Sequence, residues 1–598
     1  GYSFAESTSI TKRIDELIDA PELSFKMLDD LQEENEDLFD KWVTLQSEYP
    51  EVIKLARAFE GIPRNYGKHA GGVLITPTAI NDTFPTRTME GRKVTVWDKN
   101  VVEEAGGVKY DFLGLTTISV IELCLSYINK NYDINLKLTD LYENISIRSD
   151  ENSFGMLKHQ DSEAVFQMES NLFKSLMRDI QPDSINDLIV ITSLGRPGPL
   201  GAGMHTKYAK RKLGQEPVVM PLPNLDDILA DTYGTIVYQE QIMKISQVVA
   251  GFDDNQADTY MRKALAKKDK KKMALCKEWL IYGKPQQDEH GAPIDGGIKR
   301  GYSEQELLAF WEDLKGYATY LFNKSHATSY SLLSSITAWL KYYYPKEFFA
   351  AILSLTKEPT NKKKDKKRPK YIELLEKQFN IKVESPDINL SDELFTPLAD
   401  QDKILFGLSA VKGVKNKAID AIINNRPYTS LEDFYDKVTK TNVNKTAGTN
   451  LIKSGAFDRI NPNRNALINE FHSIRKDKDE ELCEESYNSI TCMAYEDEVL
   501  NAYVTYKPWI DSYNVGDIVN FEGQVMATEE RYDKNGGLMA FVTVYAEPCT
   551  IKLIVFSRQY RLHCDLFDRA NYGRTLKIKG EKKDKNTVAF KIGSLVRE

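Results

Sequence analysis

The spacing of hydrophobic residues changes several times along this chain of 598 residues, which predicts several domains. Up to about residue 58, leucine and isoleucine recur at helical spacing. Short runs rich in β-branched residues follow at 73–75, 94–96 and 108–113, and 150–357 is again mostly helical. The last block alternates with the period of two typical of strands, at 518–525, 539–545, 551–556, 576–579 and 588–592. The sequence therefore predicts a multidomain α+β protein that is mainly helical.

The composition favours a globular protein of a reducing compartment. Hydrophobic residues make up 41% and charged residues 28% of the chain, and no apolar run is long enough to span a membrane. The 6 cysteines are scattered without a C-x-x-C pair, which argues against structural zinc. We expect a cytoplasmic location without a membrane partner. The net charge of −9 does not exclude nucleic acid, because binding to a phosphate backbone needs only local basic patches.

One acid interrupts the strand-like run 107–115. Asp111 lies among apolar residues, and Lys109 shares its strand face because side chains alternate along a strand. A carboxylate in an apolar run costs free energy unless it is paired or binds a metal. Asp111 is therefore the best candidate for a catalytic metal ligand. An ion pair with Lys109 or Arg64 is the structural alternative.

A basic, glycine-rich segment precedes the first of the short runs. Glycines let the backbone approach a ligand closely, and basic side chains beside them suit a phosphate. A lone histidine is more often structural, so the surrounding segment is what makes this one a candidate. The candidate residues here are Arg64, Lys68, His69, Gly71 and Gly72.

Basic residues are concentrated between 262 and 277. Lys263, Lys267 and Lys271 recur at i, i+4 and i+8, which places them on one helix face. Such a run is usually a solvated face, and contact with phosphates is the functional alternative. The candidates are Arg262, Lys263, Lys267, Lys268, Lys270, Lys271, Lys272 and Lys277.

A glycine-containing hairpin at 407–414 precedes an amphipathic run at 418–423, a pattern typical of a helix-hairpin-helix. Glycine in such a hairpin lets backbone N–H groups reach a phosphate, so Lys412 and Gly413 are candidate DNA contacts. A purely structural hairpin is the alternative. In the last block, aromatic residues could stack on single-stranded DNA, although we expect most of them to form the core. They are Phe521, Tyr532, Phe541 and Phe556.

Several short motifs occur in a fixed order: 64–72, 107–115, Arg-Pro-Gly-Pro-Leu at 196–200, Tyr-Gln-Glu-Gln at 238–241 and Phe-Asn-Lys-Ser-His at 322–326. Together they resemble the alpha subunits of bacterial DNA polymerase III, a family of C-type replicative polymerases. The resemblance implies a helical thumb, part of a nucleotidyltransferase-like palm, fingers, a helix-hairpin-helix and clamp-binding-like domain, and an OB-fold. The corresponding ranges are 1–58, 59–125, 126–385, 386–507 and 508–598.

The resemblance also implies template-directed DNA synthesis by two-metal nucleotidyl transfer, with two Mg²⁺ ions as cofactors. Asp111 would bind metal, and Lys109 would act beside it in catalysis. Contacts to nucleotide or phosphate would come from Arg64, Lys68, His69, Gly71, Gly72, Arg196, Arg262, Lys263 and Lys267. Contacts to DNA would come from Lys268, Lys271, Asn323, Lys324, His326, Lys412 and Gly413. The segment 258–268 resembles the family's nucleotide-facing finger helix, with Lys263 and Ala266 where the family often has arginine and glycine.

A second Asp-x-Asp strand and the N-terminal PHP domain of the family are not recognised in this sequence. We therefore expect an N-terminal polymerase segment, in cis or in trans, to supply further carboxylates, and this chain alone to be inactive. The expected partners are primer–template DNA and deoxynucleoside triphosphates. A sliding clamp is possible, but 477–486 lacks the usual hydrophobic motif. The alternatives are the C-terminal half of a split polymerase and a catalytically inactive DNA-binding relative.

Overall fold

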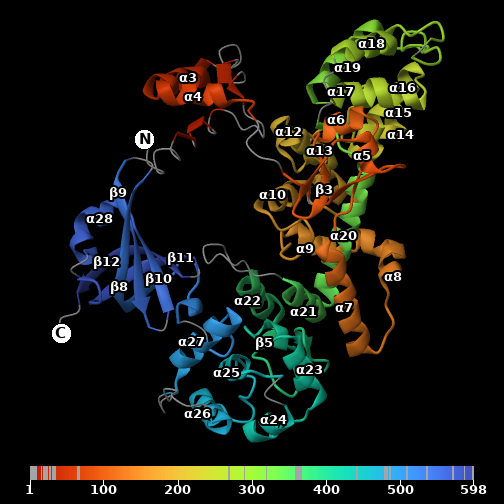
Figure 1. Ribbon diagram of the computed structural model, residues 1–598. Helices are drawn as coiled ribbons and strands as arrows, with labels where there is room; N and C mark the ends of the chain where they lie inside the picture. Colours follow the sequence, from red (N-terminus) through yellow and green to blue (C-terminus); the bar gives the residue numbers. More distant parts are fainter. Residues whose placement is uncertain are drawn as a thin grey trace. The chain divides into compact units, whose positions relative to one another are not determined.

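A computed structural model describes most of the chain, and Figure 1 shows it as a ribbon. The described residues are 10–11, 13–14, 17, 24–25, 28–29, 36–62, 67–69, 71–266, 270–288, 290–317, 320–356, 367–438, 442–476, 483, 487–506, 509–533, 536–547, 549–568, 571–584 and 586–595. The chain forms two compact units, Gly1–Gly114 and Leu115–Glu598. Each unit is described by itself.

The first unit combines short helices with two β-ribbons. Its helices are α3 (Glu36–Glu48), α4 (Pro50–Phe59), α5 (Ile80–Thr83) and α6 (Lys99–Glu104). Strand β1 (Gly72–Ile75) pairs antiparallel with β4 (Val108–Asp111), and β2 (Thr86–Met89) pairs with β3 (Arg92–Thr95). Trp42 of α3 and Ile53 of α4 share a small core with Leu28. The predicted helices before residue 58 are thus confirmed for 36–59, and the three predicted runs between 73 and 113 each contain a strand.

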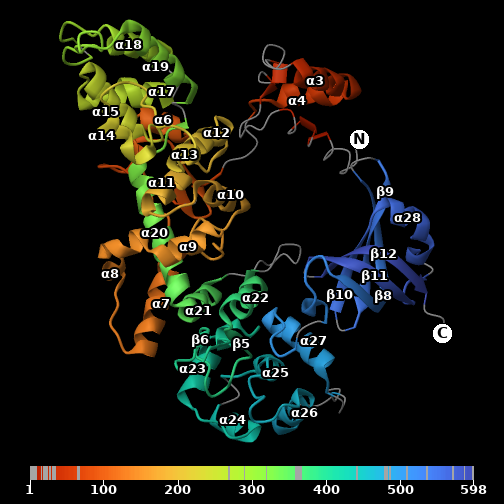
Figure 2. The same ribbon diagram turned by 180° about the vertical axis from the view of Figure 1, so that it is seen from behind.

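The first part of the second unit is a helical block. Helix α20 packs along α11, and both are labelled in Figure 2. A large apolar core extends from Phe154 to Ala338. The helices are α7 (Thr116–Tyr132), α8 (Leu138–Glu143), α9 (Glu151–Lys158), α10 (Asn171–Ile180), α11 (Ile185–Leu194), α12 (Pro197–Gly201), α13 (Met204–Lys212), α14 (Asp226–Leu229), α15 (Gln239–Ala250), α16 (Asp254–Gln256), the π-helix η3 (Ala257–Lys263), α17 (Ala264–Ala266), α18 (Lys270–Ile281), α19 (Glu304–Tyr317), α20 (Lys324–Tyr343), α21 (Pro345–Leu355) and α22 (Lys367–Phe379).

A smaller helical region follows, and it shares one hydrophobic core with α7, α21 and α22. It contains a three-stranded sheet of order β5-β7-β6, formed by Lys382–Glu384, Lys403–Leu405 and Thr396–Pro397. Its helices are α23 (Asn416–Asn424), α24 (Leu431–Lys437), α25 (Lys445–Lys453), α26 (Arg464–Arg475) and α27 (Ser489–Leu500).

Two predicted domain boundaries fall within continuous structure. The boundary at 125 lies inside α7, and the boundary at 385 separates β5 from its partner β7. The five domain ranges stay predictions.

The last region is a closed barrel of strand order β10-β12-β11-β8-β9. The strands are β8 (Ile518–Tyr532), β9 (Leu538–Ala546), β10 (Cys549–Val555), β11 (Thr575–Asp584) and β12 (Thr587–Leu595), with α28 (Ser557–His563) between β10 and β11. Strand β10 runs parallel to β12, and the other pairs are antiparallel. All five strands predicted from period-two alternation are confirmed. Alternation works well here because one face of each strand fills the barrel and the other meets solvent.

Candidate nucleotide and nucleic-acid interface

Asp111 lies at the end of β4, and the β1–β4 ribbon sets its surroundings. The register places Gly72 opposite Asp111 and Leu74 opposite Lys109. One carboxylate oxygen of Asp111 lies 3.1 Å from Lys109 Nζ, so the predicted shared strand face is confirmed. The same oxygen lies 3.7 Å from His69 Nδ1. We call these three side chains the Asp111 cluster.

The glycines beside the Asp111 cluster make this approach possible. His69 Nδ1 accepts a hydrogen bond of 2.6 Å from the backbone N–H of Gly72. This nitrogen is therefore an acceptor in this geometry, and its proximity to Asp111 is not a hydrogen bond. A Cβ atom on Gly72 would lie 2.7 Å from His69 Nδ1 and 3.2 Å from Asp111 Oδ1, and a Cβ on Gly71 would lie 2.5 Å from Leu113. Any larger residue at 71 or 72 would push these groups apart.

The structure corrects one premise about Asp111. Its side chain is 44% exposed, and Val108, Tyr110, Phe112 and Leu113 around it are also exposed. Within the described residues β4 pairs only with β1, so the run 107–115 is not buried there. Asp111 is therefore not a buried charge in this unit, and burial does not require it to have a partner or a metal.

The other candidates in this segment are placed differently. Lys68 forms an ion pair with Glu90, whose pKa is held below its ordinary value chiefly by that hydrogen bond. Lys68 therefore has a local partner and does not join the Asp111 cluster. Arg64 lies outside the described residues.

Two motifs of the helical block are bonded to each other. Tyr238 forms a parallel β-bridge with Phe322, and the N–H of Gln239 donates to the carbonyl of Phe322 over 2.9 Å. The carboxylate of Glu240 accepts from the backbone N–H of Lys324 at 3.0 Å and from Asn323 Nδ2 at 2.9 Å. It thus receives an N–H group at the start of α20 that has no partner within the helix.

For the side chains of the motif at 238–241 there are two alternatives, contact with a template and packing inside the helical block. Tyr238 and Gln241 are buried. The amide oxygen of Gln241 accepts from the N–H groups of Val237 and Tyr238, at 2.8 and 2.9 Å. The packing alternative therefore holds for these two residues. These two residues support the motif at 322–326 through the bridge between Tyr238 and Phe322.

The surface formed by Arg196 and the motif at 322–326 is basic and aromatic. His326 is exposed and stacks on Tyr330 with ring centroids 4.4 Å apart. Lys324 Nζ lies 5.2 Å from the ring centroid of Tyr238. Arg196 places its guanidinium 4.3 Å from the ring centroid of Phe322 and donates to the carbonyl of Tyr320 over 2.8 Å. Half-burial lowers the pKa of Arg196, although the group stays charged. The predicted residues Arg196, Asn323, Lys324 and His326 are therefore brought onto one surface.

The basic segment 262–277 begins in the π-helix η3. Asp258 forms ion pairs with both Arg262 and Lys263, the latter at 2.7 Å. These hydrogen bonds, with that of Arg262 the larger, lower the pKa of Asp258. The wider turn of a π-helix allows residues i+4 and i+5 to lie over residue i. Lys271 lies on α18, whereas Lys267 and Lys268 lie outside the described residues, so the predicted common face of Lys263, Lys267 and Lys271 stays a prediction.

The glycine-containing hairpin at 411–415 has the expected backbone. Gly413 has a φ of +83°, a conformation that favours glycine. The carbonyl of Lys412 accepts a 2.7 Å hydrogen bond from Asn450 Nδ2. A cavity of about 480 Å³ adjoins this turn and is lined by Gly413, Lys415, Asn416, Lys417, Ala418, Asn442, Asn444 and Ala447.

Sequence reasoning missed the second side of that cavity. Asn444 caps α25 by accepting from the N–H of Ala447 over 2.9 Å. Asn444 and the start of α25 therefore form a second side of the cavity beside the turn of Gly413. The signal that could have revealed it is Asn-Val-Asn-Lys at 442–445, an asparagine N-cap just before a helical run.

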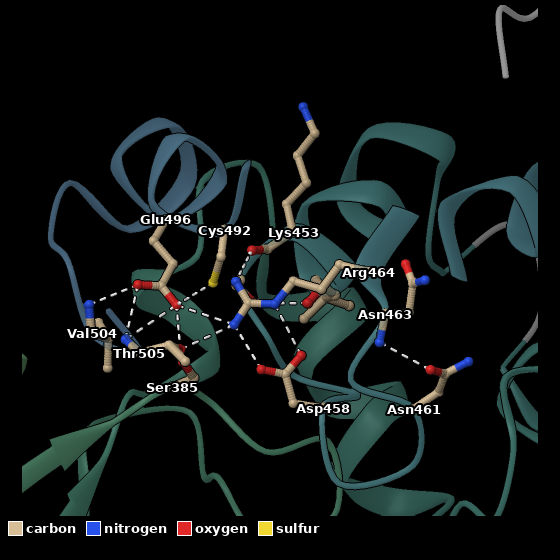
Figure 3. Close-up of polar contacts among 12 residues, drawn as sticks. Ser385, Lys453, Asp458, Asn461, Asn463, Arg464, Cys492, Glu496, Val504 and Thr505 are labelled. Atoms are coloured by element: carbon tan, nitrogen blue, oxygen red, sulfur yellow. Dashed lines mark hydrogen bonds and ion pairs between the residues drawn. The ribbon is translucent and has the colours of Figure 1, made fainter. Parts of the chain in front are cut away.

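A buried ionic cluster holds this region together, and Figure 3 shows it in close-up. Arg464 is fully buried and binds Asp458 through two hydrogen bonds of 2.9 and 2.7 Å. It also lies 3.1 Å from Glu496, which in turn accepts from the N–H groups of Val504 and Thr505 at 2.7 and 3.0 Å. Burial raises the pKa of Asp458 even though Arg464 opposes this effect. The cluster thus fastens the segment 504–505, just before the barrel, to α26 and α27.

The barrel presents one aromatic residue between two cations. Phe541 of β9 has Lys552 Nζ 4.6 Å and the Arg531 guanidinium 5.5 Å from its ring centroid. Phe521 instead packs against Trp509, with ring centroids 5.1 Å apart, and belongs to the barrel core. Tyr532 and Phe556 are exposed. The expectation that most of the four form the core is therefore wrong, because only Phe521 packs against the core, and it is itself half-buried.

No group of three or more histidine, cysteine, aspartate or glutamate side chains that could hold a metal occurs within the described residues. Asp111 is a carboxylate of the kind Mg²⁺ prefers, but Lys109 and His69 beside it supply no further anionic ligand. The described residues therefore fit one ligand of a magnesium site and do not make up a two-metal site. No helix of the described residues is long and apolar enough to cross a membrane.

Three family models match the chain in order. They are described as "Bacterial DNA polymerase III alpha NTPase domain" at 1–114, "Bacterial DNA polymerase III alpha subunit finger domain" at 117–288, and "Helix-hairpin-helix motif" at 380–467. A curated relative named DNA polymerase III subunit alpha, from Aquifex aeolicus, is 32% identical over 586 residues, which is 91% of this chain.

This chain belongs to the bacterial DNA polymerase III alpha family.

Other alpha subunits agree with the relative from Aquifex. The protein from Pasteurella multocida is 38% identical over 72% of this chain, and that from Escherichia coli K12 is 36% identical over 77%. The chain spans 47%, 36% and 39% of the length of these three relatives. The resemblance predicted from the motifs is thus confirmed. The matched NTPase region includes the Asp111 cluster, and the matched helix-hairpin-helix region includes Lys412 and Gly413.

Proposed function

We propose that this chain takes part in template-directed DNA synthesis, adding deoxynucleotides to a primer by nucleotidyl transfer. The observation that carries the proposal is the ordered match to the NTPase and finger regions of DNA polymerase III alpha subunits, with Asp111 inside the first region. The substrates would be primer–template DNA and deoxynucleoside triphosphates. The barrel would be an OB-fold, which its strand order and its helix between the third and fourth strands support.

Asp111 would serve as one carboxylate ligand for Mg²⁺. When bound, two Mg²⁺ ions would activate the primer hydroxyl and neutralise charge on the triphosphate. Lys109 lies 3.1 Å from that carboxylate and would bind a phosphate oxygen beside it. The backbone of Gly71 and Gly72, together with His69 and Lys68, would line the approach to the same phosphates, and Arg64 would add a further cation. This part of the chain would correspond to a palm.

The finger residues would bind the incoming nucleotide and the template backbone. Arg196 and His326 lie on the surface held by Glu240, and Arg262 and Lys263 follow in η3. Lys267, Lys268, Lys271, Asn323 and Lys324 would add contacts to the DNA backbone. Their contacts would go mainly to phosphates and would carry no sequence preference.

The helix-hairpin-helix region would bind the backbone of the DNA duplex. Gly413 lies in a left-handed turn, Lys412 precedes it, and Lys415 and Lys417 line the cavity beside it. Asn442 and Asn444, which line the cavity beside this turn, would contact the same phosphates. The barrel would bind single-stranded template through Phe541, whose flanking cations suit the phosphates on either side of a stacked base.

An N-terminal polymerase segment, in cis or in trans, would supply further carboxylates, since the described residues contain no group of three or more side chains that could hold a metal. This chain would then act as one part of an assembled polymerase. A primer-extension assay tests the proposal with this chain alone, with the N-terminal segment of a related alpha subunit alone, and with both together. Synthesis that requires both chains supports the proposal. A failure of the mixture to extend, although it binds DNA, supports an inactive DNA-binding relative.

A further inference from the structure

A cavity of about 260 Å³ lies inside the finger block, away from every residue assigned above. About half of its wall is apolar, and the apolar side chains include Met204, Val219, Met220 and Ile236. Helix α13, labelled in Figure 1, contributes Arg211 to the lining, and the segment after α14 contributes Thr235. By volume the cavity could hold about nine water molecules, which is the size of a compact organic molecule.

Arg211 places a buried positive charge at this cavity. The residue is only 9% exposed, and its Nη1 donates to the carbonyl of Tyr233 over 2.9 Å. Within the part of the chain that the structure describes, its Nε has no hydrogen-bond partner and no carboxylate lies within the 4.0 Å of an ion pair. A guanidinium keeps its charge at any physiological pH, and a buried charge is costly without a counter-ion.

The backbone at Gly234 leaves room for the guanidinium of Arg211. Gly234 has a φ of +70°, and a Cβ atom there would lie 2.6 Å from the carbonyl oxygen of Val219 and 3.0 Å from Arg211 Nη1. Only glycine leaves room for the guanidinium against this turn. Thr235, the next residue, is 5% exposed, and its hydroxyl likewise has no partner among the described residues. Two residues that line this cavity, Arg211 and Thr235, therefore each carry one buried polar atom without a partner among the described residues.

The charges of the remaining lining residues do not supply the missing counter-ion. Lys207 and Asp313 also line the cavity, but both are exposed, and their charges are opposite. The buried charge at the cavity is therefore the positive charge of Arg211. The apolar part of the wall favours a ligand with a hydrophobic body over a bare inorganic ion.

We propose that this cavity binds a small organic carboxylate, whose anionic group pairs with Arg211 and whose apolar body packs against Met204, Met220 and Ile236. The planar fork of a guanidinium matches a carboxylate, and the hydroxyl of Thr235 can donate to the same group. This site lies outside the nucleotide and DNA contacts proposed above, and it does not depend on them.

Ligand-detected NMR with the full chain tests the proposal, using benzoate as the probe and benzyl alcohol as its neutral counterpart. We expect benzoate to bind with a dissociation constant on the order of 1 mM and benzyl alcohol to bind at least about tenfold more weakly, because it lacks the charge. Arg211→Met should weaken benzoate binding by about tenfold or more. The matched control is Lys210→Met on the same helix, which does not line the cavity and should bind benzoate as the wild type does.

Arg211→Met also removes the bond to Tyr233 and can weaken folding, so Met220→Trp provides an independent test. Met220 is half-buried, and an indole there would fill the cavity while leaving Arg211 in place. Folded Met220→Trp protein should lose benzoate binding. Equal binding of benzoate and benzyl alcohol, unchanged benzoate binding by either folded variant, or no saturable benzoate binding by the wild type would each overturn the proposal.

Discussion

At the scale of single residues, Glu240 holds the motif at 322–326 in place on the surface of the helical block. Its carboxylate joins the motif at 238–241 to the first residues of α20, through Asn323 and Lys324. The two motifs are far apart in sequence, and the sequence of neither motif indicates that it contacts the other. The exposed residue His326 and the half-buried residue Lys324 owe their positions to this connection.

We predict that Glu240→Ala destabilises the finger block by about 1–2 kcal/mol, because an N-terminal amide of α20 and Asn323 both lose their acceptor. Thermal unfolding of the purified variant measures the effect. Glu278→Ala, an exposed acid on α18, is the matched control and should leave the melting temperature nearly unchanged. An equal melting temperature for both variants would show that Glu240 does not hold the two motifs together.

A second residue-scale prediction concerns Asp258, which neutralises Arg262 and Lys263. Because the pKa of Asp258 is lowered, its ion pairs are fully formed above about pH 4 and are lost only as the pH falls through the lowered value. Asp258→Asn at neutral pH should therefore release both cations. We expect severalfold tighter binding to primer–template DNA and a salt dependence steeper by about one phosphate contact. Fluorescence anisotropy at several salt concentrations measures both.

The control for this measurement is Asp254→Asn, which lies beside η3 and bonds Gln247 over 2.6 Å. It removes the same charge without releasing Arg262. Equal gains in affinity for the two variants would mean that net charge alone, and not the pairing in η3, limits DNA binding.

At the scale of elements, the last barrel was the most predictable part of the chain. Each strand alternates between the barrel interior and solvent, so the period of two is strong, and all five strands were located from it. The side of the helix-hairpin-helix cavity formed by Asn442 and Asn444 was missed, because Asn444 gives only a cap signal. The ion pairs of Lys68 with Glu90 and of Asp258 with Arg262 could not be derived either, because both depend on local geometry that hydrophobic spacing does not encode.

We predict that Phe541 and Phe521 of the barrel behave differently. Phe541→Leu should weaken binding of single-stranded DNA by about tenfold, because a base loses its stacking partner between Lys552 and Arg531. Phe521→Leu should lower the melting temperature through lost packing against Trp509 and leave DNA affinity nearly unchanged. Filter binding beside thermal unfolding separates the two effects. The opposite pattern would place the DNA-binding face of the barrel on the other side.

At the scale of the whole molecule, binding and synthesis are expected to separate. The basic surfaces of the fingers and of the helix-hairpin-helix region belong to this chain, whereas the metal site has only Asp111 among the described residues. If about six phosphates are contacted, affinity for primer–template DNA should fall about a thousandfold between low and moderately high salt. Affinity that does not change with salt would exclude these basic surfaces as the binding site.

The same separation predicts that this chain alone binds primer–template DNA but does not extend it. A primer-extension assay with Mg²⁺ and all four deoxynucleotides measures this directly. Robust synthesis by the purified chain would mean that its own residues supply the missing carboxylates.

The central claim is that Asp111 binds catalytic metal, and single-turnover nucleotide incorporation by the assembled polymerase tests it most directly. Asp111→Asn keeps the shape of the side chain and removes its charge, so incorporation should fall by roughly a thousandfold or more while DNA binding and the melting temperature stay close to wild type. Asp82→Asn, an exposed acid on α5, is the matched control and should incorporate normally. If folded Asp111→Asn protein incorporates nucleotides at a rate near wild type, Asp111 is a structural partner of Lys109 and the metal assignment is wrong.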